Sequence, residues 1–351
     1  MTRREFIKWL AGASVLLGGG WLWLGQKPGT PGPAAEEALA EAAPGETAPA
    51  PSPSPSPVPQ GPGELLASFF LFSDMHISAG EASMSDKLKL ALDDVTGFES
   101  PVEAIVFGGD LTDFGRDSDY RVLRSILDRY KLPKLYGNMG NHDYYDIWLT
   151  KDGQFSTETM PNGKTDAMAR QRFQKFLGMD KAYGDAWVNG VHLILVSQEA
   201  YVQERSDVGE GAWYSDEQLE WLRRTMEEHK DGKPALVFIH QPFPAVGSDG
   251  RTHQLIRANE FRAILKPYKN VFVFSGHTHR SFNGENHYNR HENLHWFNNA
   301  SVGRTRSAAP NSNVSQGMYI QVYEKEIAVR GREFSTREWI DGAQWQVKFE
   351  V

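Results

Sequence analysis

The chain has 351 residues, with 37 Lys and Arg against 45 Asp and Glu, a net charge of −8 and no cysteine. The absence of cysteine excludes disulfides, cysteine-ligated zinc, iron–sulfur clusters, cysteine catalysis and a lipid anchor on an N-terminal cysteine. The acidic balance argues against binding to the nucleic-acid backbone, because such binding needs clustered Lys and Arg. Hydrophobic residues make up 40% of the chain, enough for a sizeable core.

The N-terminus resembles a twin-arginine export signal. Residues 2–8 read TRREFIK, and an apolar run follows from Trp9 to Leu24. An ordinary secretory signal or a membrane anchor is the alternative. The run is short for a spanning helix, and the small-residue cleavage candidate at 38–40 is far from it. Cleavage and anchoring therefore both stay open. We expect an exported, extracytoplasmic protein, secreted or membrane-tethered by residues 9–24, with the twin-arginine export machinery as a partner.

A proline-rich stretch separates this segment from the rest of the chain. Residues 27–63 contain 11 of the 19 prolines. Because proline fixes φ and lacks an N–H donor, the stretch is predicted to be an extended, disordered linker. A leader lost together with the signal is the alternative. The predicted organisation is an export signal or anchor at 1–26, a linker at 27–63 and a single catalytic domain at 64–351.

The remaining residues read as an α/β domain. Short apolar runs end in polar loops and are typical of strands buried on both faces; they cover residues 65–72, 104–107, 134–136, 192–196, 235–239 and 271–274. Residues 119–130 and 215–229 carry helical apolar spacing, the second after a Ser-x-x-Gln cap. The tail alternates in period two at 318–323, 327–329 and 345–349, as antiparallel strands do. The sheets are therefore predicted to be mixed.

Polar side chains stand where the predicted strands end. Seven of them offer oxygen or imidazole ligands: Asp74, His76, Asp110, Asn141, His240, His277 and His279. That edge is where ligands bind in open α/β sheets. The set is too rich in nitrogen for Ca²⁺ or Mg²⁺ alone and suits Mn, Fe or Zn. One ion with an open position cannot use seven ligands, whereas two ions bridged by a carboxylate can. Taken singly, each motif could equally be a loop cap or a core histidine.

Their order along the chain carries more information. The blocks Asp74-x-His76, Gly109-Asp110-x-x-Asp113, Gly140-Asn141-His142-Asp143, His240 and Gly276-His277-x-His279 resemble the five-part signature of the calcineurin-like metallophosphoesterases. The resemblance covers residues 68–303. It implies a four-layer α/β/β/α sandwich of two mixed sheets, with a dinuclear metal site at the carboxyl ends of the strands. It also implies that one divalent transition-metal ion is held by Asp74, His76, Asp110 and His279, and a second by Asp110, Asn141, His240 and His277.

The resemblance further implies hydrolysis of phosphate mono- or diesters, in a small-molecule or lipid substrate, by a hydroxide that bridges the two ions. His142 directly follows a ligand and is expected to be the general acid. The family suggests that Asp113 hydrogen-bonds His142; a loop-capping carboxylate is the alternative. Monoesterase and diesterase activity are not separated, and a non-catalytic metal-binding surface protein that retains the fold is the competing function.

Two weaker signals leave alternatives open. Arg304 and Arg306 follow a predicted strand near the last block and could bind phosphate oxygens or form a solvated loop pair. The long segment 144–190 carries aromatic and basic residues that could line the substrate pocket or pack in the core: Tyr144, Tyr145, Trp148 and Lys151.

Overall fold

The computed structural model describes residues 61–284, 286–306 and 312–350. The predicted signal at 1–26 and residues 27–60 of the predicted linker lie outside these ranges. Contacts group residues 62–351 into one compact unit. Within the described ranges, no helix combines the length and the apolar character needed to cross a bilayer.

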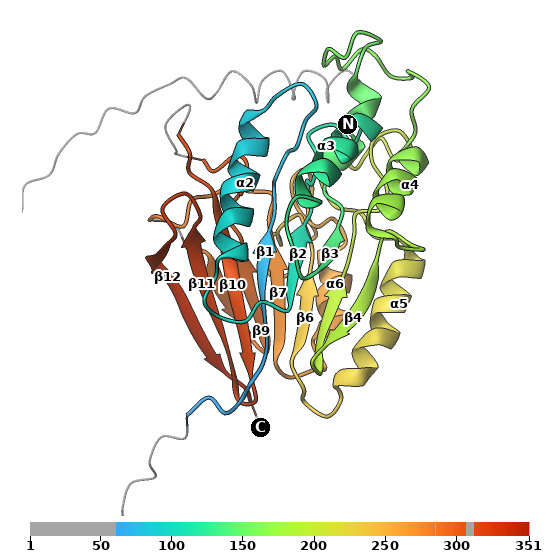
Figure 1. Ribbon diagram of the computed structural model, residues 1–351. Helices are drawn as coiled ribbons and strands as arrows, with labels where there is room; N and C mark the ends of the chain where they lie inside the picture. The colour runs from blue at the N-terminus through green and yellow to red at the C-terminus, as the bar shows by residue number, and fades with distance from the viewer. Residues whose placement is uncertain (1–60, 285, 307–311, 351) are drawn as a thin grey trace, which may run out of the picture. The chain divides into compact units, whose positions relative to one another are not determined.

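The strands form two six-stranded sheets (Figure 1). The first has the order β12-β11-β10-β1-β2-β3 and the second β4-β5-β6-β7-β9-β8. The strands are β1 (Leu65–Phe72), β2 (Ala104–Gly108), β3 (Lys134–Asn138), β4 (Gly184–Val188), β5 (Val191–Leu195), β6 (Ala235–Phe238), β7 (Val271–Ser275), β8 (Tyr288–His291), β9 (Leu294–Asn298), β10 (Gln316–Tyr323), β11 (Glu326–Glu333) and β12 (Glu338–Lys348).

Both sheets are mixed, as predicted. In the first, β1, β2 and β3 are parallel, and the C-terminal strands β10, β11 and β12 are antiparallel. In the second, β5, β6, β7 and β9 are parallel, with antiparallel strands β4 and β8 at the edges. Parallel strands need crossover connections, and helices lie in those that join β1, β2 and β3 and those that join β5, β6 and β7. The helical segments are α2 (Ser83–Thr96), α3 (Asp117–Leu127), η1 (His142–Trp148), α4 (Asp166–Leu177), α5 (Asp216–Met226), η2 (Glu227–His229) and α6 (Ala258–Leu265).

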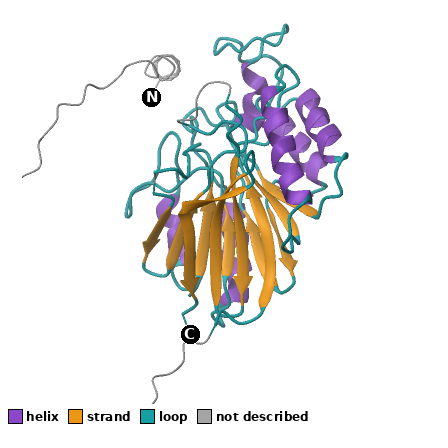
Figure 2. Ribbon diagram, turned by 60° about the vertical axis from the view of Figure 1, so that its left-hand side comes forward, coloured by secondary structure: helices purple, strands orange, loops and turns teal. Residues whose placement is uncertain are grey.

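Alternation along the strands builds the layers. Phe69 of β1 faces the second sheet, where its ring centroid lies 6.1 Å from that of Phe238. Its neighbour Phe70 faces outward and packs on Phe98, beyond the end of α2. Successive side chains of a strand point to opposite faces, so a strand buried on both faces must be apolar throughout. Figure 2 shows the strands together with helices outside them; α5 and α6 pack on the outer face of the second sheet.

The predicted α/β class is confirmed, and element boundaries shift by a few residues. The helix predicted at 119–130 is α3, which begins and ends earlier. The helix predicted at 215–229 is α5, where the Ser215 side chain accepts the Gln218 N–H and η2 forms the last turn. Helices α2, α4 and α6 and the edge strands β4 and β8 are additional. Neither edge strand has the buried, continuous apolar run that marks the central strands: β8 is polar and mostly exposed, and β4 alternates exposed with less exposed residues.

Candidate metal centre

The five motif blocks follow β1, β2, β3, β6 and β7, so the two sheets deliver them to one end of the sandwich. The structure brings all seven predicted ligands together. Ligand atoms of Asp74, His76, Asp110 and His279 lie within 4.8 Å of one another, as do those of Asp110, His240 and His277. Asn141 joins the second group, with its Oδ1 3.0 Å from Nδ1 of His277. That these residues bind metal stays a prediction.

The backbone at these residues is unusual. Five of the seven have positive φ: Asp74 (55°), His76 (50°), Asp110 (51°), His277 (67°) and His279 (54°). Residues other than glycine rarely adopt this region, and such strain, of order 1–3 kcal/mol each, gathers at functional sites. Each turn follows directly on a strand end and redirects the side chain into the shared space between the blocks.

Two motif glycines allow the blocks to approach one another. A Cβ on Gly140 would lie 2.2 Å from Oδ1 of Asp110, and one on Gly109 would lie 2.4 Å from Nδ1 of His240. Real Cβ atoms do not come this close to other heavy atoms. Gly109 also has a φ of 86°. Glycine at these two positions is thus required by packing around the predicted ligands.

Hydrogen bonds outside the cluster orient its histidines. Nδ1 of His240 donates to the Gly108 carbonyl at 2.7 Å, so Nε2 is the nitrogen that faces the cluster, 3.1 Å from Oδ2 of Asp110. Nε2 of His76 faces Nε2 of His279 within the cluster at 3.0 Å, and Nδ1 of His76 lies 3.3 Å from Oδ1 of Asp113. Imidazoles that bind metal are commonly held in this way, with the second ring nitrogen tied to a carbonyl or carboxylate.

The polar atoms at the centre fit two divalent cations. Oδ1 of Asp110 accepts the backbone N–H of His142 at 2.9 Å, whereas its buried Oδ2 faces Nε2 of His240 at 3.1 Å. Among the described residues, neither of these two buried atoms has a hydrogen-bond partner outside the cluster. Polar atoms buried in this way call for an explanation. Imidazole nitrogen with carboxylate oxygen is a donor set for Mn, Fe or Zn, which agrees with the two transition-metal ions that the fold family implies.

The charges of the cluster agree with this fit. Burial opposes ionisation of Asp74, but His279 and His240 hold its pKa to about 2. Burial and the neighbouring His142 lower the pKa of His76 to about 3, so its imidazole is neutral. Burial also disfavours charge on His240, yet Asp110 raises its pKa to about 9. The proton on His240 occupies the place of a cation, and metal binding would release it.

His142, the predicted general acid, stands beside the cluster. It opens the 3₁₀ segment η1, whose three-residue turns place Tyr145 on the same side, and the two rings stack with centroids 4.0 Å apart. Nδ1 of His142 lies 3.2 Å from Oδ1 and 3.1 Å from the carbonyl of Asp113. Burial opposes its charge, but Asp110 and the Asp113 contact raise the pKa of His142. The contact expected between Asp113 and His142 is therefore present.

Asp113 has two further partners. Its Oδ1 lies 3.3 Å from Nδ1 of His76, and its Oδ2 accepts from Nη2 of Arg304 at 2.8 Å. Arg304 is thus tied to the cluster through Nη2 and is not simply a solvated loop residue, although its side chain is 31% exposed. That it binds phosphate oxygens stays a prediction. The two residues are 191 positions apart, and no local pattern links them.

Other residues of the centre were not identified from the sequence. Asp143 is fully buried and accepts from the backbone N–H groups of Thr112 and Gly140, which joins the second block to the third. Nδ1 of His253 lies 3.1 Å from Nε2 of His277. Asp143 belongs to a quoted block and could have been assigned a role on that ground, but a single histidine in a loop carries no signal. Among the segment 144–190, Tyr144 and Trp148 are core residues.

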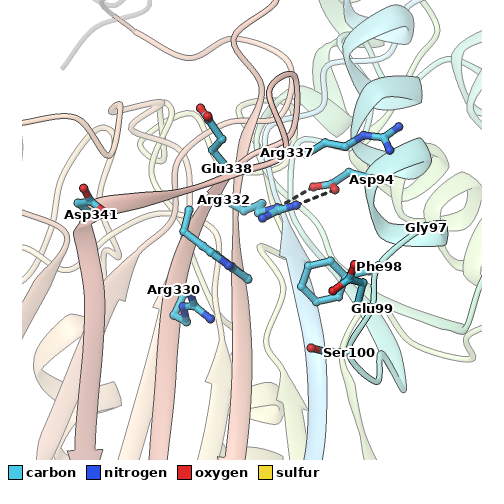
Figure 3. Close-up of a pocket in the computed structure, with 11 residues that line it drawn as sticks. Asp94, Gly97, Phe98, Glu99, Ser100, Arg330, Arg332, Arg337, Glu338 and Asp341 are labelled. Atoms are coloured by element: carbon cyan, nitrogen blue, oxygen red, sulfur yellow. Dashed lines mark hydrogen bonds and ion pairs between the residues drawn. The ribbon is translucent and has the colours of Figure 1, made fainter.

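A separate hollow of about 880 Å³ lies against α2, β11 and β12 (Figure 3). None of the seven predicted ligands lines it. Arg332 forms a bidentate pair with buried Asp94 at 2.8 and 2.9 Å, and Trp339 stacks with Arg330 at 3.6 Å from its ring centroid. Its three arginines are matched by four carboxylates, so the lining has no net positive charge; the carboxylates are those of Asp94, Glu99, Glu338 and Asp341. We assign no site there.

Comparison with known proteins supports the geometry. The family model described as Calcineurin-like phosphoesterase matches residues 67–281. A glycerophosphodiester phosphodiesterase (GpdQ) of Enterobacter lignolyticus is 23% identical over 212 residues, covering 60% of this chain and 65% of that protein. A second GpdQ-named protein, from Arcobacter nitrofigilis, is 24% identical over 186 residues, covering 51% and 57%. The chain therefore spans less than two thirds of each relative.

Solved structures share the fold. A dimetal phosphatase from Danio rerio superposes with a TM-score of 0.57 at 14% identity, covering 82% of this chain and all of that one. The purple acid phosphatase PPD1 from yellow lupin, Lupinus luteus, gives a TM-score of 0.54 at 12% identity, covering 83% and 55%.

Proposed function

The chain belongs to the calcineurin-like phosphoesterase family, and from this premise we propose that it is an exported, metal-dependent hydrolase of phosphate esters. The observation that carries the proposal is the convergence of seven donor side chains on one point. There, Oδ2 of Asp110 and Nε2 of His240 are buried 3.1 Å apart and have no hydrogen-bond partner outside the cluster among the described residues. Beside this cluster stands His142, an acid–base residue that is not itself assigned as a metal ligand. A cluster of ligands with such a residue next to it is a candidate active site.

The residues fall into two groups that share Asp110. Asp74, His76, Asp110 and His279 would hold one ion, and Asp110, Asn141, His240 and His277 the other. When bound, two divalent ions neutralise charge on the phosphoryl oxygens and lower the pKa of water so that it attacks at neutral pH. The protein contributes the buried carboxylates and the hydrogen bonds that fix each ring.

His142 would protonate the leaving oxygen. Because its Nδ1 faces Asp113, Nε2 is the nitrogen left for a substrate, and the side chain is 20% exposed. Stacking on Tyr145 limits rotation of the ring. Asp113 would keep the ring cationic until the proton is transferred, since a carboxylate at this distance favours the charged imidazole.

The names of the two relatives favour phosphodiesters as substrates, and we propose a diester with a small alcohol, of the glycerophosphodiester type. We further propose that residues 1–26 direct export through the twin-arginine route, that 27–63 are a spacer and that 64–351 form the catalytic domain. The paired Arg3-Arg4 ahead of an apolar run supports the first of these.

The test uses the full-length chain, stripped with a chelator and reloaded with Mn²⁺ or Zn²⁺. Its kcat/KM is measured on bis(p-nitrophenyl) phosphate, p-nitrophenyl phosphate and glycerophosphocholine. We expect metal-dependent hydrolysis, with higher kcat/KM for the diesters. Faster hydrolysis of the monoester would contradict the substrate proposal. A chain that binds two ions and hydrolyses none of the three would instead favour the non-catalytic metal-binding protein.

A further inference from the structure

We propose that Glu210 is a positioning residue that holds the Asn141 amide with its oxygen toward the metal centre. The inference rests on the proposed function, because it takes Asn141 as a ligand. Glu210 lies in the connection between β5 and α5, 69 residues after Asn141, and no motif includes it. It is 2% exposed although it carries a carboxylate.

Three donors surround this carboxylate. Oε2 accepts from Nδ2 of Asn141 at 2.6 Å and from the Tyr145 hydroxyl at 2.6 Å. Oε1 accepts from the Tyr201 hydroxyl at 2.6 Å. An ionised carboxylate only accepts hydrogen bonds, and bonds to a charged acceptor are short and strong. The buried carboxylate is therefore solvated by the protein itself, and one of its three donors is a predicted metal ligand.

The contact with Glu210 matters because the two ends of the Asn141 amide differ chemically. Metal ions bind the oxygen of an asparagine side chain and not its NH₂ group. A flipped Asn141 amide would place its oxygen 2.6 Å from the Glu210 carboxylate, where two acceptors repel each other. Only the orientation with NH₂ toward Glu210 is favourable, and it leaves Oδ1 on the side of His277, 3.0 Å from its Nδ1. Outer partners of this kind orient metal ligands.

The same carboxylate reaches the predicted acid. Tyr145, which donates to Glu210, is the ring on which His142 stacks at 4.0 Å. Glu210 thus bonds both Asn141, a member of the second ligand group, and Tyr145, on which His142 stacks. A residue that only stabilised the fold would have the same contacts. The test must therefore separate an effect on the orientation of Asn141 from an effect on overall stability. Tyr201 offers the matched control, because it bonds Oε1 of the same carboxylate and does not contact Asn141.

The first variant is Glu210→Gln, which keeps the volume but loses the charge and makes one end of the side chain a donor. In the metal-free full-length chain titrated with Mn²⁺, we expect one of the two ions to bind roughly 10–100-fold more weakly, the usual effect of losing an outer partner. The affinity of the other ion should be unchanged. Tyr201→Phe should lower Tm and leave both affinities as in wild type.

An exchange of groups sharpens the test. Asn141→Asp alone sets two carboxylates against each other and should also weaken one ion. Asn141→Asp combined with Glu210→Gln restores a donor–acceptor pair, since the Gln amide donates to the new carboxylate, and both oxygens of that carboxylate can bind metal. We expect the double variant to recover most of the lost affinity. If Glu210 only stabilised the fold, no recovery would occur. Comparing Asn141→Asp with the double variant tests the proposal even if Glu210→Gln alone fails to fold.

The outcomes are distinct. Wild-type affinities in Glu210→Gln, equal weakening in Tyr201→Phe, or no recovery in the double variant would each overturn the role of Glu210 while leaving the proposed enzyme intact. A wild-type chain that binds fewer than two Mn²⁺ at saturation would instead overturn the metal centre itself, and this inference with it. Circular dichroism and Tm, recorded for every variant, report on folding independently of metal.

Discussion

Replacing His142 by Ala should slow the hydrolysis of alkyl phosphate esters far more than that of p-nitrophenyl esters. An alkyl alcohol leaves as an unstable alkoxide and needs a proton, whereas p-nitrophenolate leaves readily without one. Nε2 of His142 is the ring nitrogen available for this transfer, because Nδ1 is engaged by Asp113.

The size of the effect follows from what the substitution removes. General acid–base catalysis contributes roughly 10²–10⁴-fold, which at 1.36 kcal/mol per decade is about 2.7–5.4 kcal/mol of activation free energy. Asp113→Asn should cause a smaller loss with the same ranking of substrates. The backbone carbonyl of Asp113, 3.1 Å from Nδ1 of His142, survives that substitution and still holds the ring.

The assay compares kcat/KM for an alkyl and a p-nitrophenyl ester of the same phosphate at matched pH and metal. Using one phosphoryl group with two leaving groups makes each variant its own control for binding at the metal centre. Metal content, measured by elemental analysis, should stay near wild type in both variants, because neither side chain is assigned as a ligand. Tm is recorded as well, since His142→Ala also removes the stack on Tyr145.

Two results would refute this reasoning. Equal losses on both leaving groups would mean that His142 binds the phosphoryl oxygens and does not deliver a proton. Loss of metal in His142→Ala would mean that His142 is a ligand, and the division of the cluster between two ions would then be wrong.

Asp110→Asn should lose both ions and the activity, because Asp110 belongs to both ligand groups; retention of one ion with wild-type affinity, measured by elemental analysis and titration, would contradict the bridging role. Replacing Arg3 and Arg4 by Lys should block export, because a receptor reads the arginine pair and not its charge alone; unchanged export in cell fractionation would exclude the twin-arginine route. Arg332→Gln should destabilise the fold by about 3–5 kcal/mol in urea unfolding, because it leaves the buried Asp94 carboxylate without its bidentate partner. A loss below about 1 kcal/mol, typical of an exposed pair, would show that water or another group replaces the arginine.

The sequence alone was sufficient for the central strands and for placing the seven candidate ligands at strand ends. β1 and β7 are continuous apolar runs, a signal contained within each segment. His76 follows β1 of the first sheet, and His277, 201 positions later, follows β7 of the second. The strand pattern places each of them at the carboxyl end of a strand, where ligands bind, but their meeting across two sheets was implied only by the family resemblance. Their grouping between two ions and the role of His142 came from family resemblance and remain to be tested by experiment.

The tertiary structure alone decided which residues support that centre. Arg304 reaches Asp113 across 191 positions, and Glu210 reaches Asn141 across 69. Each of these contacts joins a loop to a motif, and loops have no periodicity from which a partner could be deduced. The edge strands β4 and β8 were not predicted for a related reason: neither contains a buried apolar run of its own, and each is defined by backbone pairing with a neighbouring strand. Local patterns therefore place the elements and the motif side chains, whereas the orientation of those side chains depends on residues that only the packed loops bring near.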